Sequence, residues 1–135
     1  MGTLDTKFMK IYFANSLANA PEEYRRQMTE MREKLKGSFE VLEYFGLGEG
    51  TAEEIYKHDL DCLQKCDLVL AEVSQPSTGV GFEIATALGL GKKVLAAAAE
   101  DAIVSRMIMG IIHPNYKFIR YTNPGEVLNF DFKSL

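Results

Sequence analysis

Five short apolar runs, separated by segments of helical character, constrain the fold of this chain more than any other feature. Strands are predicted over these runs, at Lys10–Ala14, Phe39–Tyr44, Leu68–Val73, Lys93–Ala96 and Lys117–Tyr121. Helices are predicted at Pro21–Lys36, Thr51–Lys65, Phe82–Leu90, Ile103–Ile112 and, as a last turn, Pro124–Phe130. Because alternating apolar strands and helices bury a sheet on both faces, we expect an α/β fold. Its core is a five-stranded parallel sheet flanked by helices, of Rossmann-like or flavodoxin-like type.

Local signals support three of these helices, of which Phe82–Leu90 is closed by Gly89 and Gly91. Thr51 and Glu54 have the spacing of a capping box at the start of the second helix. Ile103, Met107 and Ile111 recur at helical spacing, which predicts an amphipathic helix whose apolar stripe packs either in the core or against a second copy of the chain.

Length and composition limit the class of protein. The 135 residues fit one domain, expected over residues 9–135, with residues 1–8 as a leader or tag remnant. The net charge of −4 argues against polymeric nucleic acid as a partner, because such surfaces cluster Lys and Arg. No apolar run approaches the roughly 20 residues that cross a bilayer, so no membrane association and a cytoplasmic location are expected.

Neither a metal nor a cofactor is predicted. Cys62 and Cys66 lie four residues apart without the further ligands of a zinc site, so we interpret both as small apolar side chains. Gly79 and Gly81 lack the rest of a dinucleotide fingerprint, which excludes a nicotinamide or flavin site on that basis.

The segment Ala71–Glu83 carries the strongest functional signal. An apolar strand leads into a turn with Gly79 and Gly81, and a helix is predicted to follow, with Glu83 in its first turn. Backbone N–H groups and hydroxyls at such a turn can hold an anion. The alternative is that Glu83 only complements the helix dipole and that Ser77 is an ordinary turn residue.

In parallel sheets, ligands bind beyond the carboxyl ends of the strands. By this rule, one edge of the sheet should bring together residues 12–17, 46–59, 74–83 and 97–105. Asp59 and His58 belong to this group, although either could simply be a solvated helix residue.

Four blocks of sequence resemble one known family. They are Lys10–Ser16, His58–Asp67, Ala71–Glu83 and Val104–Gly110, and QPSTGVGFE over Gln75–Glu83 is the most specific part. The chain is similar to the nucleoside 2-deoxyribosyltransferase-like family, and most to its branch of 2′-deoxynucleoside 5′-monophosphate N-glycosidases. The resemblance extends from Lys10 to Tyr121.

The resemblance implies a role for each matching residue. Glu83 matches the nucleophile that attacks the anomeric carbon, Asp59 the carboxylate that assists the departing base, and Tyr12 the hydroxyl that orients the nucleophile. The implied phosphate contacts are Ser16, Ser77, Gly79, Gly81 and Ser105, the last supplied by the neighbouring subunit of a homodimer. The implied base and sugar contacts are Asn15, Leu17 and His58, together with Phe45.

Two positions bear on the substrate. Transferases that act on unphosphorylated nucleosides tend to have an acidic residue where this chain has Ser77, so a neutral hydroxyl favours a phosphorylated substrate. Ala18 stands where the monophosphate branch often has an arginine, so Arg25, Arg106 or a lysine would have to replace that cation.

The expected activity is hydrolysis of a 2′-deoxynucleoside 5′-monophosphate to a free base and 2-deoxyribose 5-phosphate through a glycosyl–Glu83 ester. Three alternatives stay open from the sequence. They are base exchange on unphosphorylated deoxynucleosides, hydrolysis of a ribonucleotide such as CMP, and a nucleotide-binding module without turnover.

Overall fold

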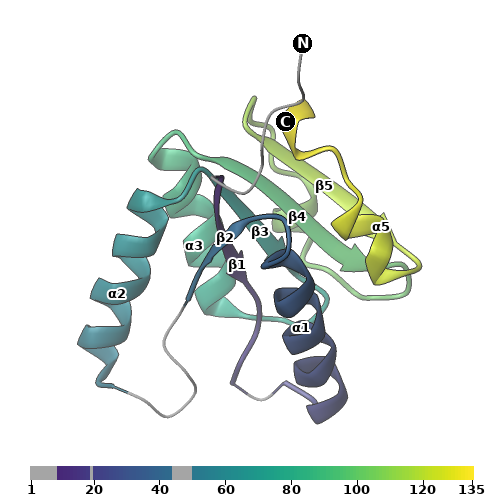
Figure 1. The fold of residues 1–135 in the computed structure, drawn as a ribbon, viewed down its shortest axis with the longest axis horizontal. Helices are drawn as coiled ribbons and strands as arrows, with labels where there is room; N and C mark the ends of the chain where they lie inside the picture. The colour runs from purple at the N-terminus through teal and green to yellow at the C-terminus, as the bar shows by residue number, and fades with distance from the viewer. Residues whose placement is uncertain (1–8, 19, 44–49) are drawn as a thin grey trace.

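The described chain forms one parallel sheet between two layers of helices (Figure 1). The computed structural model describes residues 9–18, 20–43 and 50–135. Its strands are β1 (Lys10–Ala14), β2 (Glu40–Leu42), β3 (Leu68–Glu72), β4 (Lys93–Ala99) and β5 (Tyr116–Tyr121), in the order β2-β1-β3-β4-β5. Its helices are α1 (Glu22–Leu35), α2 (Ala52–Lys65), α3 (Thr78–Gly89), α4 (Arg106–Met109), α5 (Pro124–Leu128) and the 3₁₀ turn η2 (Phe132–Ser134). The predicted fold class is confirmed, whereas residues 1–8 and Phe45 lie outside the described residues.

Each face of the sheet has its own apolar core. One core joins α1 and α5 to side chains such as Ile11, Phe13 and Leu70. The other joins α2 and α3 to Tyr12, Val69 and neighbours. Because successive strand residues point to opposite faces, β1 and β3 contribute to both cores. Figure 1 accordingly shows α2 and α3 on one side of the sheet and α1 and α5 on the other.

The predicted helix boundaries are found where a local hydrogen-bond pattern fixes them. The Glu54 N–H donates to Thr51 Oγ1 at 3.1 Å, and the Thr51 N–H donates to Glu54 Oε1 at 2.9 Å, which completes the capping box. At the end of α3, Gly91 has a φ of +77°. The Gly91 and Lys92 N–H groups donate to the Leu88 and Ala87 carbonyls, the pattern of a Schellman cap.

The prediction of a helix over Ile103–Ile112 is wrong. Only Arg106–Met109 is helical, since the Met109 and Gly110 N–H groups donate to the Ser105 and Arg106 carbonyls and the helix ends there. Of the two expectations for the apolar stripe, packing in the core is wrong, because Ile103 and Met107 are 92% and 82% exposed. Val104 alone of that segment is buried, and it lies outside the helix.

Two strand predictions were short. β4 continues past Ala96 to Ala99, because Ala97 pairs with Glu72 on β3 and Ala97–Ala99 pair with Ile119–Tyr121 on β5. β5 begins at Tyr116, one residue early. Within the described ranges, no helix is long and apolar enough to span a membrane.

Candidate active site

Glu83 is held by a tyrosine from the middle of the sheet. Tyr12, 2% exposed on β1, donates from its Oη to Glu83 Oε2 at 2.5 Å. The two residues are 71 positions apart in the chain and meet because Tyr12 points to the face of the sheet that α3 covers. This hydrogen bond orients the Glu83 carboxylate through one of its two oxygens.

Glu83 lies one turn deeper in its helix than predicted. α3 begins at Thr78 rather than Phe82, because Ser77 Oγ accepts from the Val80 N–H at 3.2 Å and caps the helix early. Both Gly79 and Gly81 therefore lie inside the helix, and Glu83 stands in its second turn. The first-turn N–H groups of α3 lack intrahelical acceptors, and among them that of Val80 is bonded to the Ser77 cap.

The surroundings of Glu83 favour its protonated form. Burial raises its pKa from the ordinary 4.5 to about 7, the hydrogen bond from Tyr12 opposes this, and the charge of Asp59 adds to it. Burial and the charge of Glu83 also raise the pKa of Tyr12, so Tyr12 stays a donor. A carboxylate that titrates near neutral pH beside a second carboxylate is typical of a catalytic pair.

A cavity of about 370 Å³ opens next to this pair. Its described lining comes from the loop after β1, from α2 and from the start of α3. The predicted site residues that it brings together are Asn15, Leu17, Asp59, Ser77, Gly79 and Glu83, with Ala18 beside them. Among the described lining residues there is no Lys or Arg, so the cavity offers neutral N–H and O–H donors.

Asn15 adds one donor of this kind. Its Nδ2 is buried and has no hydrogen-bond partner among the described residues. A buried amide without a partner costs free energy, which a ligand acceptor in the cavity would offset.

Two residues that were predicted to contact the substrate lie outside the lining of this cavity. Ser16 is buried, and its Oγ donates to the Pro76 carbonyl at 3.4 Å. The Nε2 of His58 lies 2.7 Å from the Glu43 carbonyl oxygen, which directs the ring toward the end of β2. Neither residue is among those that line the cavity.

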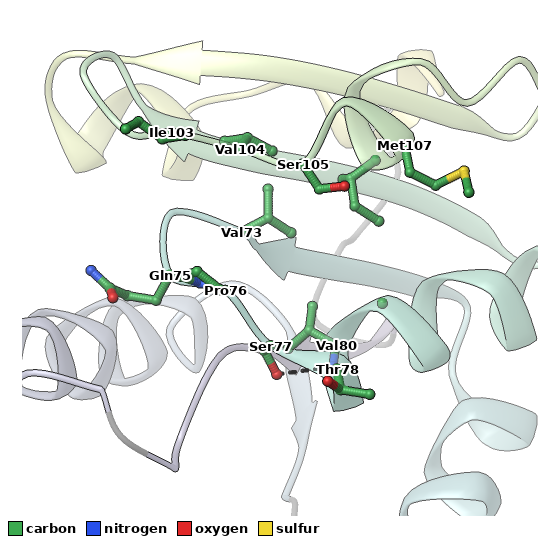
Figure 2. A pocket seen from close by; sticks show the side chains of 12 residues that line it. Val73, Gln75, Pro76, Ser77, Thr78, Val80, Ile103, Val104, Ser105 and Met107 are labelled. Atoms are coloured by element: carbon green, nitrogen blue, oxygen red, sulfur yellow. Dashed lines mark hydrogen bonds between the residues drawn. The ribbon is translucent and has the colours of Figure 1, made fainter.

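Gly81 and Ser105 line a separate groove of about 530 Å³ between α3 and the segment before α4. Figure 2 shows Ser105, Val104 and Met107 on one side of this groove and Ser77, Thr78 and Val80 on the other. Ser77 contributes to both the groove and the Glu83 cavity. Ser105 is exposed and does not reach the cavity of its own chain.

An aromatic pair at the mouth of the cavity was not predicted. Tyr56 on α2 and Phe82 on α3 are each about half exposed, and their ring centroids lie 6.1 Å apart. Both line the cavity. Helical spacing could have found them, since Tyr56 precedes Asp59 by three residues and Phe82 follows Gly79 by three.

The cysteines are structural in character. Cys62 and Cys66 are buried free thiols, and burial raises the pKa of each to about 11. Such thiols are poor nucleophiles at neutral pH. In the described part of the chain, no three His, Cys, Asp or Glu side chains gather as a metal site would require.

Comparison with known proteins assigns the family. The sequence model of the family described as nucleoside 2-deoxyribosyltransferase matches residues 11–109. The chain belongs to the nucleoside 2-deoxyribosyltransferase family. The family predicted from the four sequence blocks is thus confirmed.

Relatives place the chain near one branch of this family. A Syntrophotalea carbinolica protein, provisionally named 2′-deoxynucleoside 5′-phosphate N-hydrolase 1, is 35% identical over 130 residues, which cover 88% of this chain and 89% of the relative. A Thermofilum pendens protein of the same name is 41% identical over 80 residues, but these are 58% of this chain and 56% of that protein. The solved structure of a Clostridium botulinum CMP N-glycosidase matches with a TM-score of 0.63 at 25% identity, covering 88% of this chain and 95% of that one.

Proposed function

We propose that this protein hydrolyses the N-glycosidic bond of 2′-deoxynucleoside 5′-monophosphates and releases a free base and 2-deoxyribose 5-phosphate. The observation that carries the proposal is the Tyr12–Glu83 hydrogen bond beside a cavity that also contains Asp59 and the start of α3. The names of the Syntrophotalea and Thermofilum relatives support the same reaction and substrate class.

The chemistry follows from two carboxylates with different roles. Ionised Glu83 forms an ester bond to the anomeric carbon while the C–N bond breaks and its electron pair leaves with the base. Asp59 assists this departure by hydrogen bonding or by protonating the base. Water then attacks the same carbon and passes one proton to Asp59 or to solvent, which releases Glu83 as a carboxylate and yields the sugar phosphate. Tyr12 keeps the Glu83 carboxylate oriented throughout.

The 5′-phosphate would bind at the first turn of α3. The Ser77 hydroxyl and the first N–H groups of the helix supply donors there, and the helix dipole favours an anion. Gly79 leaves the approach open, because a Cβ at that position would meet only Ser77 Oγ, at 3.9 Å. Asn15 and Leu17 would contact the sugar or base from the opposite wall of the cavity.

We further propose a homodimer in which Ser105 reaches the partner's phosphate site. Highly exposed apolar side chains flank Ser105 in the sequence: Ile103, Met107 and, further along, Ile112, which is 99% exposed. Exposed apolar surface of this kind marks an interaction site. Sedimentation of the purified chain distinguishes a mass of 15.1 kDa from twice that value.

The direct test is chromatography of the free base after incubation with each deoxynucleoside monophosphate. The wild type is expected to release base, and Glu83→Gln to lose at least about 10³-fold in kcat, as removal of a catalytic nucleophile does. If no base appears from any nucleotide at high enzyme concentration, the proposed function is wrong.

Two further incubations separate the rival functions. Transfer between thymidine and adenine would indicate a deoxyribosyltransferase instead. Release of cytosine from CMP, in preference to dCMP, would indicate the activity for which the Clostridium relative is named. Nucleotide binding that Glu83→Gln leaves intact, with no turnover by the wild type, would indicate a binding module.

A further inference from the structure

Glu72 is a buried carboxylate that the proposed mechanism does not use. It is the last residue of β3 and only 1% exposed. By the alternation of the strand it points to the face covered by α1 and α5, opposite the face that holds Glu83. A charge in such a place is costly unless donors surround it.

Four neutral donors point at this one carboxylate. Tyr24 Oη donates to Oε1 at 2.9 Å, and the Ser74 N–H donates to the same oxygen at 2.8 Å. Ser74 Oγ donates to Oε2 at 2.7 Å, and Tyr121 Oη also donates to Oε2. An ionised carboxylate is an acceptor only, with about four lone-pair sites, so these donors match its full capacity.

Ser74 links the Glu72 carboxylate to two segments of the site. Because its Oγ proton is used on Glu72, the same oxygen accepts from the Ala99 N–H, at 2.8 Å. Ser74 opens the turn that leads through Pro76 and Ser77 into α3. Ala99 ends β4 and precedes the segment that carries Ser105. One carboxylate thereby fixes the start of both segments.

We propose that Glu72 is a positioning residue for the 5′-phosphate, acting through Ser74 on the turn that presents Ser77 and the first N–H groups of α3. The inference rests on the proposed function, because it concerns the phosphate site of that reaction. The described cavity lining has no Lys or Arg, so affinity for the phosphate depends on how accurately neutral donors are placed.

The test is the steady-state kinetics of Glu72→Gln on the best monophosphate substrate. The new NH₂ group would face hydrogen-bond donors, so Ser74 would reorient and the turn that binds the phosphate would shift. We expect KM to rise about tenfold or more, which is the effect of losing one hydrogen bond to a charged group. The kcat should stay near that of the wild type, because Tyr12 and Glu83 lie on the other face of the sheet. A purely structural role would instead lower the active fraction and kcat and leave KM unchanged.

Asp67→Asn is the matched control. Its carboxylate also accepts a backbone N–H, from Lys10 at 2.8 Å, but at the amino edge of the sheet. The control should leave KM unchanged.

Tyr121→Phe provides a milder second variant. It removes one donor to Glu72 and keeps the packed ring, so it should also raise KM, but by a smaller factor than Glu72→Gln. If Glu72→Gln folds with a wild-type KM, or fails to fold while Tyr121→Phe keeps a wild-type KM, the inference is wrong and the proposed function stands. If the wild type releases no base at all, the proposed function fails and this inference fails with it.

Discussion

At the scale of single residues, the raised pKa of Glu83 ties stability and activity to pH in opposite directions. The folded state holds the Glu83 proton up to about pH 7, whereas the ordinary pKa is 4.5. The resulting stabilisation, on the order of 3 kcal/mol, is fully present below pH 4.5 and is lost as pH rises through about 7. The nucleophile, by contrast, is ionised only above that pH.

We therefore expect Glu83→Gln to be inactive but more stable than the wild type at about pH 9, by up to about 3 kcal/mol, with little difference at about pH 5. Urea denaturation at the two pH values measures this. Glu53→Gln is the control, because that exposed carboxylate pairs with Lys57 across one helical turn and its loss should change stability little. An equal stability difference at both pH values would contradict the assigned role of burial.

The environments of the Glu83 and Glu72 carboxylates could not be predicted from sequence patterns. The hydrogen bond of Tyr12 to Glu83 joins positions 71 apart, and the sequence suggested it only through resemblance to a family. Glu72 ends an apolar strand and has no local signal, because its tyrosine partners lie 48 and 49 residues away. Contacts of this range depend on the order of strands in the sheet, which a periodicity does not encode.

At the scale of elements, prediction succeeded where a few neighbouring residues decide the outcome. The capping box at Thr51 and the left-handed Gly91 are of this kind. The start of α3 was placed four residues late because glycine disfavours a helix. The Ser77 cap and the buried side chains of Val80 and Ile84 outweigh that cost.

Gly79, in the first turn of α3, gives a testable prediction for this helix. Gly79→Ala should stabilise the helix by up to about 1 kcal/mol, because Ala has the higher helix propensity and its Cβ meets no backbone atom. The same Cβ would enter the phosphate approach, so KM for the monophosphate should rise by about an order of magnitude. Gly89→Ala, at the far end of the same helix with nothing within 4 Å, should stabilise without changing KM. Thermal denaturation and kinetics of both variants measure the difference, and a wild-type KM for Gly79→Ala would exclude Gly79 from the phosphate site.

At the scale of the whole molecule, the apolar residues around Ser105 are the largest departure from a self-contained domain. The sequence left open whether this stripe packs in the core or in a dimer contact, because periodicity cannot distinguish an apolar face that packs inside a chain from one that packs against a second chain. The structure exposes Ile103 and Met107 beside the groove that contains Ser77 and Ser105. A dimer through this face would complete each site with a serine from the other subunit.

Complementation tests this arrangement directly. Ser105→Ala is expected to raise KM, and Glu83→Gln to abolish turnover, so each homodimer is impaired at both sites. In a heterodimer of the two variants, one site combines an intact Glu83 from one chain with an intact Ser105 from the other. Mixed subunits should therefore show more activity at low substrate than either variant alone. If Ser105 serves the site of its own chain, no site in the mixture has both residues, and the activity at low substrate should stay within that of the two parents.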